Sequence, residues 1–378
     1  MTKDGEDPYE GREHSRIKHE FLRKYVERLA IKIGMSGFST INFVDGFAGP
    51  WSSNDGDYSD TSFAIAVETL GNVRGFLRSK GKYVKPRYFL CEKSRGAHAK
   101  LASFAESKGA GVVAFRGRFE DNLANIDARI DSQNDFTFTL IDPKGWKVDS
   151  AKVFDFLKRQ KRGEVLLNFM SDHINRHAGF SEVEQSFGLF LGNPDWTAER
   201  DRLPSGWSNE RKVLHLMKRR LKQEGLARFC PDMPIEHKDQ KRTKMRLVLG
   251  TQHPAGVHVF RDVHAKMRDF EVEKKLKRGG DMPLFEAVPS AISGPDFDVS
   301  AVGSDAQKRI ARGLILRLLP AGTSTTFKEL VVRIMEEVAV RPTHVKDVLV
   351  DMQQSGDITF QLTGKAKKPN DKTVINGN

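Results

Sequence analysis

The sequence contains little cysteine and no long apolar run. Cys91 and Cys230 are the only cysteines among 378 residues. Two cysteines are too few for a disulfide framework or a structural zinc cluster, so we expect a reducing compartment, the cytoplasm. No run of about 18 apolar residues is present, so we expect no transmembrane helix. The first residues, MTKDGEDPYEGREHSR, are charged and lack an apolar core, so we also expect no signal peptide.

What the sequence does contain is an excess of positive charge. There are 62 lysines and arginines against 50 aspartates and glutamates, a formal net charge of +12. This excess favours an anionic partner, nucleic acid first, and the alternative is a basic surface without a partner. Hydrophobic residues make up 38% of the chain, which is enough for a sizeable core. The length suggests one large and one small domain.

Apolar segments of strand length alternate with helical patterns through the first half of the chain. This alternation predicts βαβ units, and therefore an α/β fold with a parallel sheet. We expect strands over 41–44, 87–91, 112–115, 136–141 and 165–169. We expect helices over 15–33, 61–70, 94–107, 119–130 and 149–160, a disordered segment over 1–13 and a basic linker over 71–86. The first helix has a polar face with His14, Lys18, His19, Arg23 and Lys24.

The stretch 41–50, INFVDGFAGP, combines a strand, an acid and a glycine-rich turn. Asp45 follows the strand directly, and glycine permits backbone to pass close to a ligand. This pattern is typical of ligand sites in open α/β sheets, and the alternative is an ordinary strand-to-loop turn. The candidate ligand-binding residues are Asp45, Gly46, Phe47, Ala48, Gly49 and Pro50.

Acids also follow the next three strands. Glu92 ends the second strand, Glu120 or Asp121 comes just after the third, and Asp142 ends the fourth. Because parallel strands end at the same edge of a sheet, we expect these carboxylates to converge there, where such sheets bind ligands. Random placement would scatter the acids along the elements.

The middle of the chain is strongly basic. Residues 171–208 form an expected insertion over the strand ends, a candidate substrate lid. A helix over 209–229 and the segment that follows it carry candidate phosphate-binding residues. The alternative interpretation is that these charges form a solvent-exposed helix face that binds nothing. The candidate residues are Lys218, Arg219, Arg220, Lys241 and Arg242. We expect the sheet to close with a hairpin of 245–249 and 257–260 around the turn HPAG, and a helix over 261–276 to complete the domain.

A second unit follows a linker over 277–303 that is rich in Gly, Pro and Ser. Three helical patterns and a short strand over 304–365 predict a winged-helix domain, followed by a basic tail over 366–378. Its third helix and wing present Thr343, His344, Lys346 and Lys365, which suit phosphate contacts. The alternative is a winged helix that binds only protein.

Five motifs in this order resemble the three-Cys-motif partner proteins, the TcmP family: INFVDGFAGP, FLCEK, LIDPKGW, LLNFM and LVLGTQHPAGVHVF. The resemblance covers roughly residues 14–362. It implies a class I S-adenosylmethionine-dependent methyltransferase fold, with a Rossmann-like sheet of seven strands whose last hairpin strand is antiparallel. It also implies S-adenosylmethionine as cofactor, a winged-helix-like C-terminal domain, and a partner protein of the three-Cys-motif, radical S-adenosylmethionine type.

The resemblance gives the candidate residues roles. Asp45 and the backbone of 46–49 would contact the amino-acid and sulfonium end of the cofactor. Glu92, with adjacent Lys93, would contact its ribose. Glu120 or Asp121 would contact its adenine. Asp142, Pro143, Lys144 and Trp146 occupy the place of the Asp-Pro-Pro-aromatic motif of amino-methyltransferases. This chain departs from that motif, because Lys144 replaces the second proline and Gly145 delays the aromatic residue. Trp146 as a core residue is an equal alternative.

The sequence thus predicts a methyltransferase acting on nucleic acid or a nucleic-acid-associated partner. The alternatives are a catalytically silent methyltransferase fold that acts as a binding module of a defence or mobile-element complex, and a transcription regulator. We expect no metal site, since His173 and His177 have zinc-like spacing but no third ligand. Substrate contact is the better interpretation of His173 and Arg176.

Overall fold

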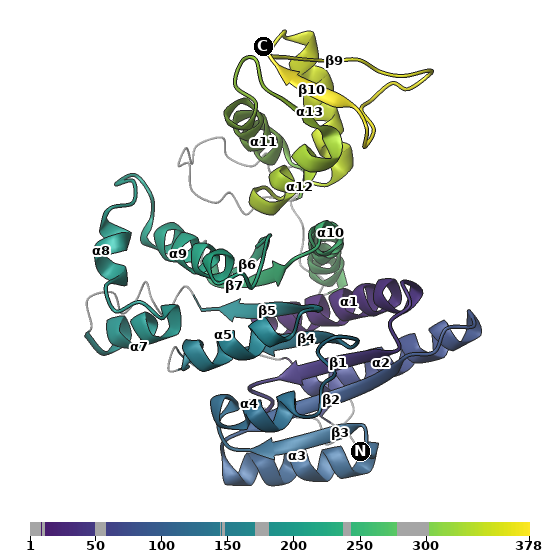
Figure 1. Cartoon of the computed structure of the whole chain (residues 1–378), viewed down its shortest axis with the longest axis vertical. Coiled ribbons are helices and arrows are strands. Elements are labelled where there is room, and N and C mark those ends of the chain that lie inside the picture. The colour runs from purple at the N-terminus through teal and green to yellow at the C-terminus, as the bar shows by residue number, and fades with distance from the viewer. Residues whose placement is uncertain are drawn as a thin grey trace. The chain divides into compact units, whose positions relative to one another are not determined.

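A computed structural model describes residues 9, 12–49, 58–143, 145, 148–170, 181–236, 243–277 and 302–378. By their contacts the residues divide into two compact units, Met1–His253 and Pro254–Asn378 (Figure 1). No helix within these ranges is both long and apolar enough to cross a membrane.

The first unit is built on a sheet of seven strands. The strands are β1 (Thr40–Asp45), β2 (Lys85–Glu92), β3 (Val112–Arg116), β4 (Phe136–Ile141), β5 (Gly163–Phe169), β6 (Asp232–Glu236) and β7 (Thr243–Thr251). Their order is β3-β2-β1-β4-β5-β7-β6, with β1 to β5 parallel and β7 antiparallel to both neighbours. This confirms the Rossmann-like sheet of seven strands. The order reverses between β1 and β4, so that is where such a sheet binds ligands.

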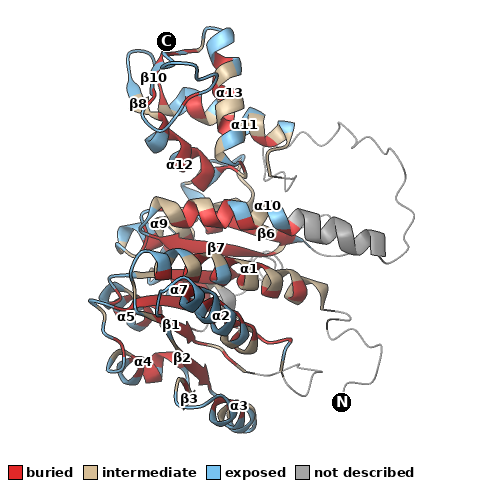
Figure 2. Ribbon diagram, turned by 90° about the vertical axis from the view of Figure 1, so that its right-hand side faces the viewer, coloured by how far each residue is buried: buried red, intermediate tan, exposed pale blue. Residues whose placement is uncertain are grey.

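Helices cover both faces of this sheet. The helices α1 (Glu13–Met35) and α2 (Ser62–Ser79) line an apolar gap on one face with Ile41, Phe43, Phe136 and Phe138. The helices α5 (Ser150–Arg159), α7 (Ser181–Leu191) and α9 (Asn209–Gln223) line another on the opposite face with Ile141, Val165 and Leu167. Within the described ranges the unit also contains α3 (Arg95–Lys108), α4 (Phe119–Asp127) and α8 (Trp196–Asp201). Figure 2 shows the resulting layer of buried strands.

The core includes part of the segment expected as an insertion. Phe187 and Phe190 of α7 and Trp196 of α8 are almost fully buried. α7 and the start of α8 therefore pack on the body of the unit through these side chains. Residues 171–180, with His173, Arg176 and His177, lie outside the described residues.

The expected closing hairpin is wrong. The partner of β7 is β6, and 257–260 lies in α10 (Pro254–Lys277). Pro254 opens this helix, where a missing N–H costs nothing. The buried residues Val257, Phe260, Val263 and Met267 follow helical spacing, although VHVF alone reads as strand alternation. β6 contains Pro234, which is tolerated because β6 is an edge strand.

The expected linker over 71–86 is also wrong in its first part. α2 continues to Ser79 through Gly71 and Gly75, and both glycines are exposed. It ends in a Schellman motif, in which the Gly81 N–H donates to the Arg78 carbonyl and the Lys82 N–H to the Leu77 carbonyl. Gly81 has φ +69°, a conformation that favours glycine.

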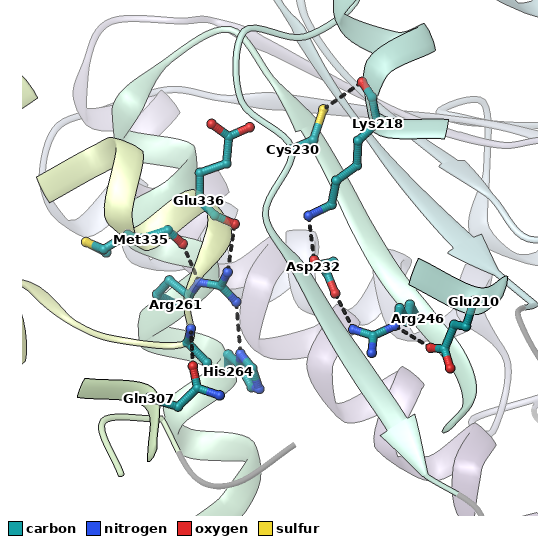
Figure 3. Close-up of polar contacts among 11 residues, drawn as sticks. Glu210, Lys218, Cys230, Asp232, Arg246, Arg261, His264, Gln307, Met335 and Glu336 are labelled. Carbon is teal, nitrogen blue, oxygen red and sulfur yellow. Dashed lines mark hydrogen bonds and ion pairs between the residues drawn. The ribbon is translucent and has the colours of Figure 1, made fainter. Parts of the chain in front are cut away.

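The second unit consists of α10, three further helices and a small sheet. These are α11 (Asp305–Leu318), β8 (Ser324–Thr326), α12 (Phe327–Glu337), α13 (Pro342–Gln354), β9 (Ile358–Phe360) and β10 (Val374–Gly377). The antiparallel sheet has the order β8-β10-β9. Residues 366–378 therefore contain a strand rather than only a basic tail. Buried Arg261 joins α10 to α12, because its guanidinium donates to the carbonyls of Met335 and Glu336 (Figure 3).

A buried ion-pair cluster ties α9 to the β6–β7 hairpin (Figure 3). The side chain of Arg246 is 2% exposed and donates to Glu210 Oε1 and Asp232 Oδ2, each at 2.6 Å. Lys218 Nζ lies 2.6 Å from the other oxygen of Asp232. Two acids and two bases thus balance their charges where little water reaches them.

We expect Arg246→Met to lower the free energy of unfolding of the first unit by about 3–5 kcal/mol, because it leaves buried carboxylates short of positive charge. Arg219→Met is the control, because it removes a partly exposed pair with Glu199, worth about 0–1 kcal/mol. All 4 tryptophans of the chain lie in the first unit, so urea unfolding followed by tryptophan fluorescence reports on that unit. Equal losses in both variants would contradict the expectation.

Candidate functional site

Asp45 is the most buried acid at the carboxyl edge of the sheet. Its side chain has no solvent exposure and accepts hydrogen bonds from the Phe47 N–H (2.9 Å) and the Ser62 hydroxyl (2.6 Å). Burial raises the pKa of Asp45 to about 6, although both hydrogen bonds lower it, and the charge of Asp142 adds to the rise. This carboxyl group therefore holds its proton to a higher pH than an ordinary aspartate, and a nearby cation would favour its ionised form.

The glycine turn after Asp45 lies across the ends of two neighbouring strands. The Gly46 N–H donates to the Leu140 carbonyl at 3.2 Å, and the Ala48 N–H donates to the Cys91 carbonyl at 2.9 Å. A Cβ on Gly46 would come within 2.7 Å of the Phe119 ring, so only glycine fits. The candidate residues 46–49 thus lie at the edge as expected, while Pro50 lies outside the described residues.

Glu92 ends β2 beside this turn. It is 3% exposed, and its Oε1 accepts a hydrogen bond from the Ser94 N–H at 2.5 Å. The neighbouring Lys93 is exposed. Asp45 pairs with Leu90 in the sheet, so Glu92 lies two residues farther along β2 at the same edge.

The sequence does not decide between Glu120 and Asp121 as the acid that follows the third strand, and the structure shows that the two differ in burial. Glu120 is buried and accepts from the Asp149 N–H at 3.0 Å and from Arg118 at 2.8 Å. Asp121 is exposed. Of the two, Glu120 is the acid that lies in the interior, where it links α4 to the segment before α5.

Asp142 forms a polar triad with two residues from other elements. Its Oδ1 accepts from the Asn168 side-chain amide at 2.6 Å, and its Oδ2 forms an ion pair with Lys18 Nζ of α1. Asn168 is 3% exposed, and its Oδ1 has no hydrogen-bond partner among the residues that the structure describes. An acceptor of this kind, buried and unsatisfied, suits a donor group of a bound molecule.

The polar face expected for the first helix is partly buried. Lys18 reaches the carboxyl edge, and its neighbours Arg16 and His19 are buried. The His19 Nδ1 lies 3.0 Å from the Tyr9 hydroxyl, and burial holds the pKa of His19 well below its usual range. In the sequence, the close spacing of the polar residues Arg16, Lys18 and His19 in this amphipathic helix is the feature that points to the contact between Lys18 and Asp142.

The expected disorder of 1–13 is wrong at its end. Arg12 pairs with buried Asp60 at 2.5 Å, and Glu13 begins α1. Arg12 therefore fixes the entry to α1 against the start of α2.

The loop after β4 is described only in part. Pro143 is buried, and Gly145 has φ +94°. Lys144 and Trp146 lie outside the described residues. Within the described ranges, no group of three or more His, Cys, Asp or Glu side chains could hold a metal ion.

The basic residues expected to bind phosphate are mostly engaged with acids. Lys218 is half-buried and pairs with Asp232, as described above. Arg219 pairs with Glu199, and Arg220 pairs with Glu224 at 2.7 Å. Lys241 and Arg242 lie outside the described residues. The described face of α9 therefore offers less positive charge than its sequence suggests.

In the second unit the candidate residues differ in exposure. Thr343 and Lys365 are exposed. Lys346 lies over the Phe327 ring, with its Nζ 5.2 Å from the centroid. His344 accepts from the Arg341 N–H at 3.2 Å, and burial, aided by the charge of Arg341, lowers its pKa. Thr343 and Lys365 are thus the two that are open to a partner.

Comparisons with known proteins bear on the fold alone. No family model and no curated protein matches the chain. Among solved structures, the O-methyltransferase TomG from Streptomyces achromogenes in complex with SAM is 13% identical, with a TM-score of 0.33, over 67% of this chain and 93% of that one. An O-methyltransferase from Bacillus cereus in complex with SAH is 13% identical, with a TM-score of 0.32, over 61% and 80%. Protein LPL1258 from Legionella pneumophila is 10% identical, with a TM-score of 0.36, over 69% and 93%.

Proposed function

We propose that the first unit binds S-adenosylmethionine at its carboxyl edge and transfers the methyl group to an acceptor held beside Asp142. The observation that carries this proposal is the convergence of Asp45, Glu92 and Asp142 at the ends of three adjacent strands, where the strand order reverses. Ligands of open α/β sheets bind at such a reversal. Three carboxylates at one edge suit a ligand that carries positive charge and hydroxyl groups.

The residues present fit the parts of this cofactor. Its α-ammonium group would lie near the carboxylate of Asp45, and its two ribose hydroxyls would donate to Glu92. When bound, the cofactor supplies a methyl group activated by a sulfonium. The tight turn of 46–49 lets backbone approach the ligand, because no side chain projects from Gly46.

The triad of Lys18, Asp142 and Asn168 would hold the acceptor. Asp142 and the unsatisfied Oδ1 of Asn168 both accept hydrogen bonds, so they would orient an N–H or O–H group of the acceptor. Lys18 holds the side chain of Asp142 in place through their ion pair. In this role Asp142 would accept the proton that the acceptor loses on methylation.

We further propose that the acceptor is nucleic acid or belongs to a nucleic-acid-associated partner. The net charge of +12 supports this, as do exposed Thr343 and Lys365 in the second unit. The second unit has the order helix, strand, helix, helix, strand, strand after α10, which supports a winged-helix domain. Membership of the three-Cys-motif partner family, and a radical S-adenosylmethionine-type partner, rest on the motif resemblance.

One observation favours a second function, that of a catalytically silent binding module. Lys18 places a cation against Asp142, at the edge where a cationic sulfonium would have to lie. Like charges repel each other strongly where water is scarce. Transfer of a labelled methyl group to DNA, RNA or cell lysate separates the two functions: incorporation supports the enzyme, and cofactor binding without incorporation supports the binding module.

Binding of the cofactor should depend on pH through Asp45. Its carboxyl group has a pKa of about 6 in the free protein, and a bound ammonium group would lower it, so binding below pH 6 releases a proton. Affinity should therefore be about tenfold weaker at pH 5 than at pH 7. Calorimetry across this range measures the effect, and a pH-independent affinity of the wild type contradicts it.

Two variants sharpen that measurement. Asp45→Asn should weaken binding at pH 7 by at least about tenfold, because it loses a charged partner of the ammonium, and should remove the pH dependence. Asp121→Asn changes an exposed acid beyond β3, so its affinity should stay within about twofold of wild type. If both variants bind like wild type, the carboxyl edge is not the cofactor site.

Asp142→Asn should separate chemistry from binding. It keeps the shape of the side chain but cannot take a proton, so kcat should fall by about 10²-fold or more. The dissociation constant of the cofactor should rise much less than in Asp45→Asn, because the expected direct cofactor contacts are Asp45 and Glu92. If the protein is instead a catalytically silent binding module, Asp142→Asn has no methyl transfer to reduce. In that case Lys18→Met should tighten cofactor binding, because it removes a cation from the site. Radiolabel incorporation and calorimetry on the same preparations give both readouts.

A further inference from the structure

The amino ends of β1 and β2 carry a surface of opposite character to the acidic edge. Here α1 ends at Met35, α2 ends at Ser79 and β2 begins at Lys85 (Figure 1). The Lys85 N–H donates to the Ser39 carbonyl at 2.8 Å, so the start of β2 lies against the segment after α1. The end of α1 also packs tightly on α2, since a Cβ on Gly34 would meet the Leu77 side chain at 2.3 Å.

This surface exposes large apolar side chains that the core does not use. Tyr83 is 76% exposed, Met35 51% and Phe76 45%. The apolar face of α2 is already buried in the core through residues such as Leu70, Val73 and Leu77. The exposed rings of Tyr83 and Phe76 therefore contribute little to the packing of the core.

Positive charge predominates in the segment that carries Phe76 and Tyr83. The segment 69–91 contains six cations and no aspartate or glutamate: Arg74, Arg78, Lys80, Lys82, Lys85 and Arg87. Arg87 lies 3.7 Å from Asp135. The other five form no ion pair with the residues that the structure describes. Lys80 Nζ lies 5.8 Å from the centre of the Phe76 ring.

The turn that carries the lysines has a defined conformation. The Schellman motif at Gly81 fixes Lys80 and Lys82 at the end of α2, directly before Tyr83. A rigid turn loses little conformational freedom on binding, so its charges and ring are presented at low entropic cost. We call Phe76, Lys80, Lys82, Tyr83 and Lys85 the basic–aromatic patch.

We propose that the basic–aromatic patch binds single-stranded nucleic acid, with Tyr83 stacking on a base and the lysines contacting phosphates. Exposed aromatic rings among unpaired cations are the chemistry that such strands require, since bases stack on rings and the backbone is polyanionic. Duplexes offer fewer open base faces. An anionic membrane is the less suited partner, because α2 turns its apolar face to the core and leaves only isolated rings outside. The inference does not depend on methyl transfer, since the patch and the acidic edge lie at opposite ends of the same strands.

Fluorescence anisotropy with the full chain tests the proposal. The probes are labelled 15-nucleotide oligo(U) RNA, oligo(dT) and a duplex of equal length, each at 50 and 200 mM KCl. Wild type should bind both single strands more tightly than the duplex, and its affinity should fall with salt because counterions are released. RNA and single-stranded DNA share this chemistry, and the two strands show which is preferred.

The variants separate stacking from charge. Tyr83→Ala should weaken binding about tenfold, while Tyr83→Phe, which keeps the ring, should restore it. The double variant Lys80→Gln/Lys82→Gln should weaken binding and lower the salt slope by about two, one for each phosphate contact. The control Lys100→Gln/Lys152→Gln removes two exposed lysines from α3 and α5 and should change affinity by less than about twofold. Tyr83 is mostly exposed, so its variants should fold, and circular dichroism checks this.

Several outcomes would overturn the proposal. They are unchanged binding in Tyr83→Ala and the patch double variant, equal losses in Tyr83→Ala and Tyr83→Phe, or equal losses in the control. Loss of binding to phosphatidylserine vesicles in the patch variants, with oligonucleotide binding retained, would assign the patch to a membrane instead. Calorimetry with S-adenosylmethionine should be unchanged in all patch variants, and Asp45→Asn should leave oligonucleotide binding unchanged, so failure of either proposal is visible separately.

Discussion

The burial of Asp45 is the constraint on which the arrangement around the carboxyl edge depends. A carboxylate without water is stable only where hydrogen bonds or opposite charge replace the lost hydration. The Phe47 N–H and the Ser62 hydroxyl do so, which requires the turn after β1 and the first residue of α2 to be in place together. Since β1 pairs with both β2 and β4, and α2 packs on α1, one side chain joins the centre of the sheet to two helices.

The first helix is part of the site because its rotation is fixed from within. The Tyr25 hydroxyl donates to buried Glu164 of β5, and the Thr251 hydroxyl of β7 donates to the other oxygen of Glu164, each at 2.7 Å. Burial raises the pKa of both Tyr25 and Glu164. Lys18 lies seven residues before Tyr25, two helical turns away and on the same face. Anchoring Tyr25 therefore directs Lys18 toward Asp142.

The parallel part of the fold and the acids at its strand ends follow from local patterns. Each of the first five strands is a short apolar run, and the acids that end or directly follow β1, β2 and β4 lie at the shared edge. The errors fall where local and long-range preferences disagree. β6 forms despite Pro234 because an edge position tolerates proline, and VHVF becomes helical because Pro254 starts a helix. The Lys18–Asp142 pair joins residues 124 positions apart, and no local pattern gives the rotation of a helix.

Acids and cations gather at opposite ends of the same sheet, and the net charge of the chain does not reveal this separation. The carboxyl edge collects Asp45, Glu92 and Asp142, while the segment 69–91 places cations without acids around the amino ends of β1 and β2. A total of +12 conceals this separation, because a sum contains no positions. A cationic ligand and a polyanion would each find its own end of the sheet, and neither would compete for the other's charges. Parallel strands permit this separation. Each connection between successive strands from β1 to β4 brings the chain back to the edge at which the previous strand began, so all amino ends lie at one edge and all carboxyl ends at the other.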